Sequence, residues 1–151
     1  MADGETDKQR VDRELIELLN ELRVALPGVQ VLFAFLLTIP FSRGWPKTTR
    51  LEHDLFFLAL LAAVASTVLL MAPSAYHRIL FRSRSKERML LHANRLALAG
   101  LASLAVSLGA SLFLVSEYVF GSEAAGIATG VAGALVALLW YAVPIWIRLR
   151  D

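Results

Sequence analysis

The side chains best suited to metal binding or proton transfer are three histidines, because the chain contains no cysteine. His53, His77 and His92 do not have the spacing of a metal motif such as HExxH. His53 lies between Glu52 and Asp54, and this cluster is either a weak metal site or the start of a solvated helix. We favour the helix start and therefore expect neither a metal nor another cofactor.

A second histidine belongs to the sequence Tyr76-His77-Arg78. Imidazole titrates closest to neutral pH among the side chains, so His77 is a candidate pH sensor. The alternative, which we favour, is that these residues anchor a helix end at the membrane interface. The sequence has no Walker or GxGxxG phosphate loop and no GxSxG nucleophile motif, so we predict that the protein is not an enzyme.

The chain is 57% hydrophobic, and most of its apolar residues lie in four long blocks. These blocks are the elements that must position the histidines. The blocks comprise residues 24–41, 55–73, 96–115 and 124–147 and contain no Asp, Glu, Lys, Arg or His. A helix needs about 20 residues to cross the hydrocarbon core of a bilayer. Within that core an open strand would leave its backbone groups unpaired. The sequence therefore predicts an all-α integral membrane protein, with a four-helix transmembrane bundle in residues 24–151.

Basic residues are distributed unevenly between the segments that connect these blocks. Twelve of the 15 lie in the N-terminal segment, in the connector 74–95 and at the C-terminus, against three between the first two blocks. The positive-inside rule then places both termini in the cytoplasm, and we expect an inner-membrane protein. The connector from Arg78 to Arg95 is a candidate partner for anionic lipid headgroups. Phe81 is the only Phe, Trp or Tyr among its charges, so we expect no nucleic-acid partner.

The N-terminal segment, residues 1–23, is acidic and amphipathic. Apolar residues recur at spacings of three and four from Asp7 to Leu26, which predicts a helix with one apolar face. Pro27 and Gly28 follow and provide a site for a bend. We expect this helix to lie on the cytoplasmic side, along the interface or against its neighbours. Its apolar positions are Val11, Leu15, Leu18, Leu19, Leu22 and Leu26.

The connector 74–95 is too long and too apolar to be a simple turn. We expect the second and third helices to extend beyond their apolar blocks into the cytoplasm. The chain should then reverse direction near residues 83–85.

Polar side chains inside the blocks are candidates for interhelical hydrogen bonds or for a transport path. Gln30 is the most costly to leave unpaired, because a primary amide has two donors and an acceptor. We favour an interhelical hydrogen bond for it over a role in lining a pore. None of these residues is ionisable, whereas proton relays and cation transporters keep ionisable groups at membrane depth. The candidates are Gln30, Thr38, Ser66, Thr67, Ser103 and Ser107.

Small residues repeat along the last two blocks, which indicates close helix packing because small side chains let helix backbones approach in lipid. In the third block they recur at every fourth position. In the fourth block they form a GxxxG motif and continue beyond it. The packing is either within one chain or between copies, so a homo-oligomer is one of the two alternatives. These residues are Ala99, Ser103, Ser107 and Ser111, followed by Gly126, Gly130, Gly133 and Ala137.

Two motifs resemble a family of small actinobacterial membrane proteins. One runs from Asn20 to Phe35, NELRVALPGVQVLFAF, and is followed by Pro40-Phe41; the other is Ala72 to Arg78, APSAYHR, continuing to Phe81-Arg82. The resemblance implies four helices and a domain of unknown function, and many members are labelled sodium:proton antiporters. It singles out interfacial candidates without assigning them a catalytic role. These are Glu21, Arg23, Pro27, Tyr76, His77 and Arg78.

Two functions are compatible with these patterns. The first is a non-enzymatic interaction or accessory protein whose cytoplasmic surfaces serve lipid or protein partners. The alternative is transport of Na⁺ and H⁺ by an oligomer, with Gln30, Thr38 and the serines of the third block lining the path. In both, the lipid bilayer is the main surrounding of the chain.

Overall fold

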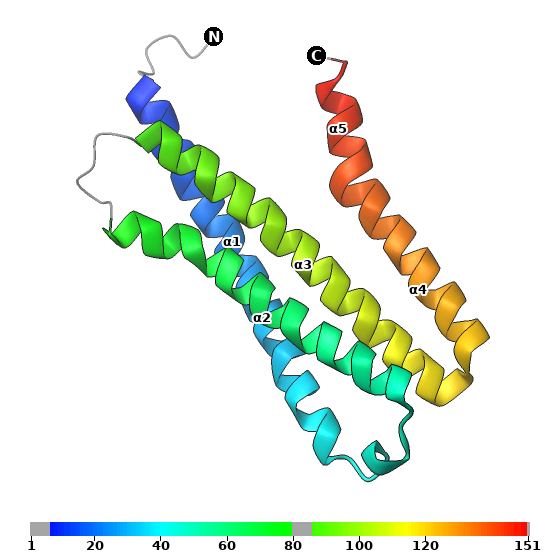
Figure 1. Cartoon of the computed structure of the whole chain (residues 1–151). Coiled ribbons are helices and arrows are strands. Elements are labelled where there is room, and N and C mark those ends of the chain that lie inside the picture. The colour runs from blue at the N-terminus through cyan, green and yellow to red at the C-terminus, as the bar shows by residue number, and fades with distance from the viewer. Residues whose placement is uncertain (1–6, 80–85, 151) are drawn as a thin grey trace. The chain divides into compact units, whose positions relative to one another are not determined.

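The computed structural model describes residues 7–79 and 86–150. Every secondary-structure element in these ranges is a helix (Figure 1). Four helices are long and apolar enough to cross a membrane, which confirms the predicted all-α fold with four candidate spans. The elements are α1 (Asp7–Thr38), η1 (Ile39–Phe41), η2 (Trp45–Lys47), α2 (Arg50–Ile79), α3 (Lys86–Phe120), α4 (Ser122–Val136), η3 (Ala137–Ala142) and α5 (Val143–Arg148).

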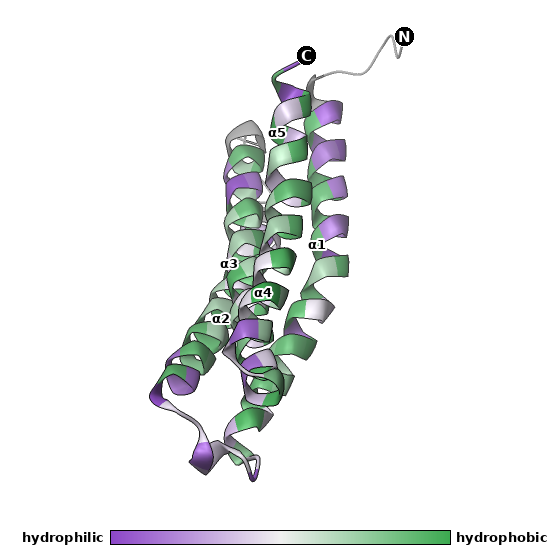
Figure 2. Cartoon of the chain, turned by 90° about the vertical axis from the view of Figure 1, so that its right-hand side faces the viewer, coloured by the Kyte–Doolittle hydropathy of each residue, from purple (hydrophilic) through white to green (hydrophobic). Residues whose placement is uncertain are grey.

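Helix α1 joins the amphipathic segment and the first apolar block in one helix of 32 residues. At 1.5 Å per residue it is about 48 Å long, more than the hydrocarbon core of about 30 Å. Pro27, where we expected a site for a bend, lies inside this helix and does not end it. Figure 2 shows hydrophilic residues gathered in the first turns of α1 and hydrophobic residues farther along.

Helices α2 and α3 both continue beyond their apolar blocks, as expected. Helix α2 has 30 residues and extends to Ile79, while α3 has 35 residues and begins at Lys86. The predicted reversal near residues 83–85 falls outside the described residues.

The fourth span contains a π-helical segment, η3, between α4 and α5. The backbone N–H of Val143 bonds to the carbonyl of Leu138, five residues earlier. The next residue, Pro144, has no N–H to donate to the carbonyl of Trp140, and its ring crowds the preceding turn. A proline of this kind is a common reason for a local widening of a helix. The distortion that precedes Pro144 is thus a π-helical turn.

The chain divides into two compact units, each built from segments of several helices. The first comprises residues 1–35 and 63–104. Its core is formed by Leu22 and Val29 of α1, Leu70 of α2 and Ala97 of α3. Val11 and Leu15 are also buried, so the apolar face predicted for the N-terminal helix is confirmed.

The second unit comprises residues 36–62 and 105–151. Its buried residues include Ala59 of α2, Ser107 and Leu114 of α3, and Ala125 of α4. The hydroxyl of Ser107 donates a 2.8 Å hydrogen bond to the backbone carbonyl of Ala59, which joins α2 to α3. Small side chains at these positions allow the backbones to come this close.

Candidate functional site

The turn between α1 and α2, in the second unit, is built around a stack of two rings. The rings of Trp45 and His53 stack with centroids 4.4 Å apart, and Phe56 meets Trp45 edge-on at 5.0 Å. The hydroxyl of Thr48 donates to the carbonyl of Trp45 at 2.6 Å. Its oxygen lies 2.7 Å from His53 Nε2. Because the hydroxyl proton is already donated to Trp45, this oxygen accepts a hydrogen bond from the imidazole tautomer that carries its proton on Nε2. His53 therefore has a structural role in this turn.

A reciprocal capping box begins α2 within the same turn. The backbone N–H of Thr49 donates to Glu52 Oε2 at 2.5 Å, and the N–H of Glu52 donates to the Thr49 hydroxyl at 3.3 Å. The pair satisfies two N–H groups that a helix start leaves without partners. The signal T-x-x-E at residues 49–52 was available in the sequence, but we did not predict the cap. Glu52 is only 6% exposed.

These contacts agree with the interpretation of residues 52–54 as a helix start. Glu52 caps the helix and His53 stacks on Trp45, so the two side chains are used in the turn. Within the described ranges 7–79 and 86–150, no group of three His, Asp or Glu residues is placed to hold a metal ion. The structure supports a helix start at this position.

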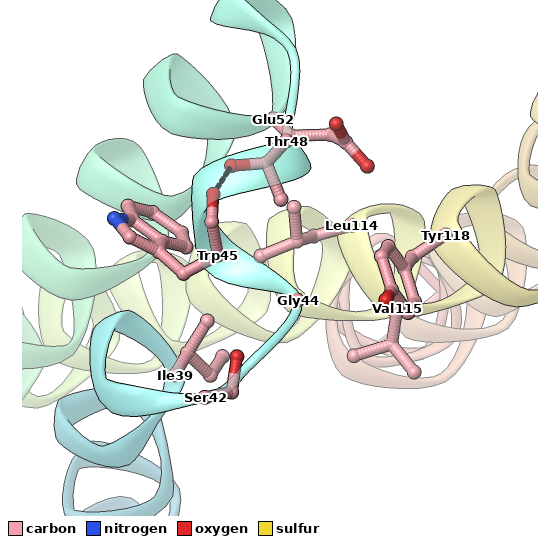
Figure 3. Close-up of a pocket in the computed structure, with 9 residues that line it drawn as sticks. All are labelled: Ile39, Ser42, Gly44, Trp45, Thr48, Glu52, Leu114, Val115 and Tyr118. Carbon is pink, nitrogen blue, oxygen red and sulfur yellow. Dashed lines mark hydrogen bonds between the residues drawn. The ribbon is translucent and has the colours of Figure 1, made fainter.

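A pocket of about 240 Å³ lies beside this turn, and Figure 3 shows the residues that line it. Tyr118 of α3 packs against Gly44, where a Cβ atom would lie 2.5 Å from the phenolic oxygen. The walls combine apolar side chains with the carboxylate of Glu52 and a few hydroxyl groups, and the capping role already occupies one carboxylate oxygen. The lining residues are Ile39, Ser42, Gly44, Trp45, Thr48, Glu52, Leu114, Val115 and Tyr118.

The polar residues of the four candidate spans differ in their hydrogen-bond partners. Ser107 bonds across to α2, as described, whereas the hydroxyls of Thr67 and Ser111 donate to carbonyls of their own helices, Ala63 at 2.9 Å and Ser107 at 2.7 Å. Ser66 is fully buried, and its hydroxyl has no hydrogen-bond partner among the described residues.

The remaining polar candidates are more accessible. Gln30 and Thr38 of α1 are exposed, and Ser103 of α3 is half-buried. The exposed position of Gln30 does not favour the predicted hydrogen bond to another helix of the same chain. Its amide faces whatever surrounds the chain, either lipid or another protein.

The small residues of α3 pack at a different period from the one we predicted. Ala99 is exposed, whereas Ala97 and Gly100 are buried. The buried positions follow spacings of three and four because an α-helix has 3.6 residues per turn, and strict steps of four rotate away from the interface. At Gly100 a Cβ atom would lie 2.7 Å from the side chain of Leu70, within the first unit.

The glycines of α4 do not pack against any described residue. Gly126, Gly130 and Gly133 are exposed, and a Cβ atom at any of them would have no described neighbour within 4 Å. The side of α4 that faces α3 carries Thr129 and the buried Ala125. A Cβ atom at Gly109 of α3 would lie 3.9 Å from the Thr129 methyl carbon. Within the second unit, no described residue packs against the glycine stripe.

The two sequence motifs meet in the first unit. Arg23 of the first motif and Arg78 of the second line one pocket, together with Ser74. Glu21, Pro27 and Tyr76 are exposed, and Tyr76 retains 41% of its accessible surface. His77 lies on α2, but its side chain is outside the described part of the structure.

The described residues form helices, four of which are long and apolar enough to cross a membrane, as in the class of small multi-span membrane proteins. Residues 4–144 match a family of unknown function, DUF6328, and the chain belongs to this family. No curated protein and no solved structure matches the chain.

Proposed function

We propose that this protein is a non-enzymatic, multi-pass protein of the inner membrane that acts by association, and that its partner is a second copy of the same chain. The observation that carries the proposal is the exposure of the fourth span, Ser122–Arg148. None of the residues in its most apolar stretch is buried, against 28% for the span in α2 and 22% for the span in α3.

The exposed glycines of α4 favour a helix partner over lipid alone. Lipid chains solvate apolar side chains well, so helices associate in a bilayer where small residues allow tight backbone packing. Gly126 and Gly130 have the spacing of such a motif, and Gly133 extends it. The chain already uses this kind of contact at Gly100, where Leu70 packs against the backbone.

A second copy is the partner that this stripe fits most simply. In a two-fold symmetric dimer the same surface serves both subunits, so one stripe of small residues is sufficient. The distribution of basic residues supports an orientation in which both termini of each copy are cytoplasmic. Two copies in that orientation would present their fourth helices in parallel, the arrangement in which a GxxxG stripe meets itself.

Disulfide cross-linking tests this proposal directly, because the natural chain has no cysteine to give a background. Ala137→Cys places a thiol on the glycine stripe, and Leu135→Cys places one on the opposite, exposed side of the span. In native membranes we expect a cross-linked dimer from Ala137→Cys and much less from Leu135→Cys. Adding Gly130→Leu to Ala137→Cys should abolish the cross-link, because the bulky side chain separates the helices.

The results of this experiment distinguish a second copy of the chain from random collision and from a different partner protein. Equal cross-linking at positions 135 and 137 would mean random collision and would contradict a specific interface. A monomeric mass in nanodiscs together with a cross-link to a different protein would replace self-association with a heteromeric contact.

A second candidate function is transport of Na⁺ and H⁺ by an oligomer, and the exposure of Gln30 is the observation that favours it. An amide on the outside of a span can line a path only where copies meet. Flux measured in proteoliposomes across a range of pH tests this function. Purified protein that moves neither ion would eliminate transport, and flux that survives Gln30→Leu and His77→Ala would exclude those two residues from the path.

A further inference from the structure

A second pocket, in the first unit, brings two arginines together from distant parts of the sequence. It has a volume of about 310 Å³, at the lower end of the range for small-ligand pockets. Leu19, Arg23 and Leu26 of α1 form one wall, and Ser74 and Arg78 of α2 form the other. The spacings of three and four within each helix place these side chains on one face.

Among the side chains that the structure describes, none balances the charges of this pocket. No described carboxylate forms an ion pair with Arg23 or Arg78. Earlier arginines of α1 differ in this respect, since Arg10 pairs with Glu14 at 3.8 Å and Arg13 pairs with Glu17 at 3.2 Å. Two guanidinium groups and a hydroxyl form a donor set suited to a phosphate group, because each guanidinium can donate two parallel hydrogen bonds.

The pocket also lies at the depth expected for lipid headgroups. Arg23 is the last charged residue before the apolar block that begins at residue 24, and Arg78 follows the block that ends at Pro73. Leu19 and Leu26 add apolar surface to the same wall. A soluble phosphate would gain nothing from these leucines, whereas a phospholipid can place its glycerol and first methylene groups against them.

We propose that Arg23, Ser74 and Arg78 form a binding site for the phosphate of an anionic phospholipid. The two arginines contact the phosphodiester, Ser74 donates a further hydrogen bond, and the leucines contact the beginning of the acyl chains. The site joins α1 to α2 through the lipid, and it does not depend on association through α4.

Native mass spectrometry of the detergent-solubilised protein, titrated with phosphatidylglycerol or phosphatidylcholine, tests the site. We expect tighter binding of phosphatidylglycerol and a loss of about fivefold in its affinity for each of Arg23→Gln and Arg78→Gln. Arg23→Lys retains the charge without the planar fork, so its affinity should fall between those of the wild type and Arg23→Gln.

Arg95→Gln is the matched control, because Arg95 is exposed on α3 and does not line the pocket. It should change the affinity by less than about twofold. An equal loss in Arg95→Gln and Arg23→Gln would show diffuse attraction to a basic surface and would overturn the site. Circular dichroism of each variant confirms that the helices are retained, and Arg23→Lys keeps the test decisive if Arg23→Gln unfolds.

Inorganic phosphate and glycerol phosphate distinguish a lipid from a soluble ligand. We expect neither, at millimolar concentration, to displace phosphatidylglycerol. Displacement by either compound would assign the pocket to a soluble phosphate, and equal binding of phosphatidylcholine and phosphatidylglycerol would remove the preference for an anionic headgroup. Both results would overturn the proposal.

Discussion

The hydroxyl of Ser107 on α3 lies 2.8 Å from the backbone carbonyl oxygen of Ala59 on α2 and donates a hydrogen bond to it. Ser107 is completely buried. The hydrogen bond links α2 to α3 within the second unit.

Replacing Ser107 with alanine should remove this link and lower the free energy of unfolding by about 0.6 kcal/mol, the average for interhelical hydrogen bonds in membranes. Ser111→Ala is the control, since its hydroxyl bonds to the carbonyl of Ser107 on its own helix. Unfolding in mixed micelles measures both variants. A larger loss in Ser111→Ala than in Ser107→Ala would contradict the assigned role.

Removing the capping box should destabilise the start of α2. We expect Thr49→Ala to lower the free energy of unfolding by about 1 kcal/mol, because the Glu52 N–H loses its hydrogen-bond acceptor. Glu52→Gln should cost less than Glu52→Ala, because the amide oxygen can still accept the bond from the Thr49 N–H. Hydrogen exchange of the first turn of α2 reports these changes locally. Asp54→Asn, at an exposed position, is the comparison variant, and its exchange should change least.

Two glycines should respond in opposite ways to alanine. Gly100→Ala places a Cβ atom 2.7 Å from Leu70, and overpacking of this kind costs about 1–3 kcal/mol. Gly130→Ala meets no described neighbour and should stabilise its helix by about 0.5–1 kcal/mol, because alanine loses less conformational entropy. Thermal unfolding of the monomer in detergent compares them. Equal effects at the two positions would contradict the packing described for α3.

Gly44 and Tyr118 should be coupled energetically. Gly44→Ala brings a Cβ atom within 2.5 Å of the phenolic oxygen and 3.1 Å of the ring carbon that bears it. The substitution should therefore destabilise the protein less in a Tyr118→Phe background, where the nearest atom is gone. A double-mutant cycle measures this coupling, and additive effects would show that the two residues are independent.

The apolar blocks and the amphipathic pattern of α1 were sufficient to predict the elements of the fold. Burial of Val11, Leu15 and Leu22 agrees with the spacing of three and four in the sequence. The continuity of α1 was not predicted, because Pro27 has a similar local signature whether it ends a helix or is accommodated within one. In apolar blocks of this kind, the sequence specifies the positions of the helix ends less well than the presence of the helices.

The candidate sites were less predictable because they depend on contacts between distant residues. Arg23 and Arg78 were singled out separately, but only the packing of α1 against α2 places them in one pocket. The role of Ser107 differs from that of Ser111, although both belong to the same repeat of small residues. By contrast, the Thr49–Glu52 cap was a local signal that sequence reasoning could have found.

The unbroken course of α1 has a mechanical consequence. Within the first unit, α1 runs without a break from its charged first turns past Arg23 to the buried Val29. Restraint of the helix at Arg23 would therefore fix the orientation of those charged turns relative to the apolar core of this unit.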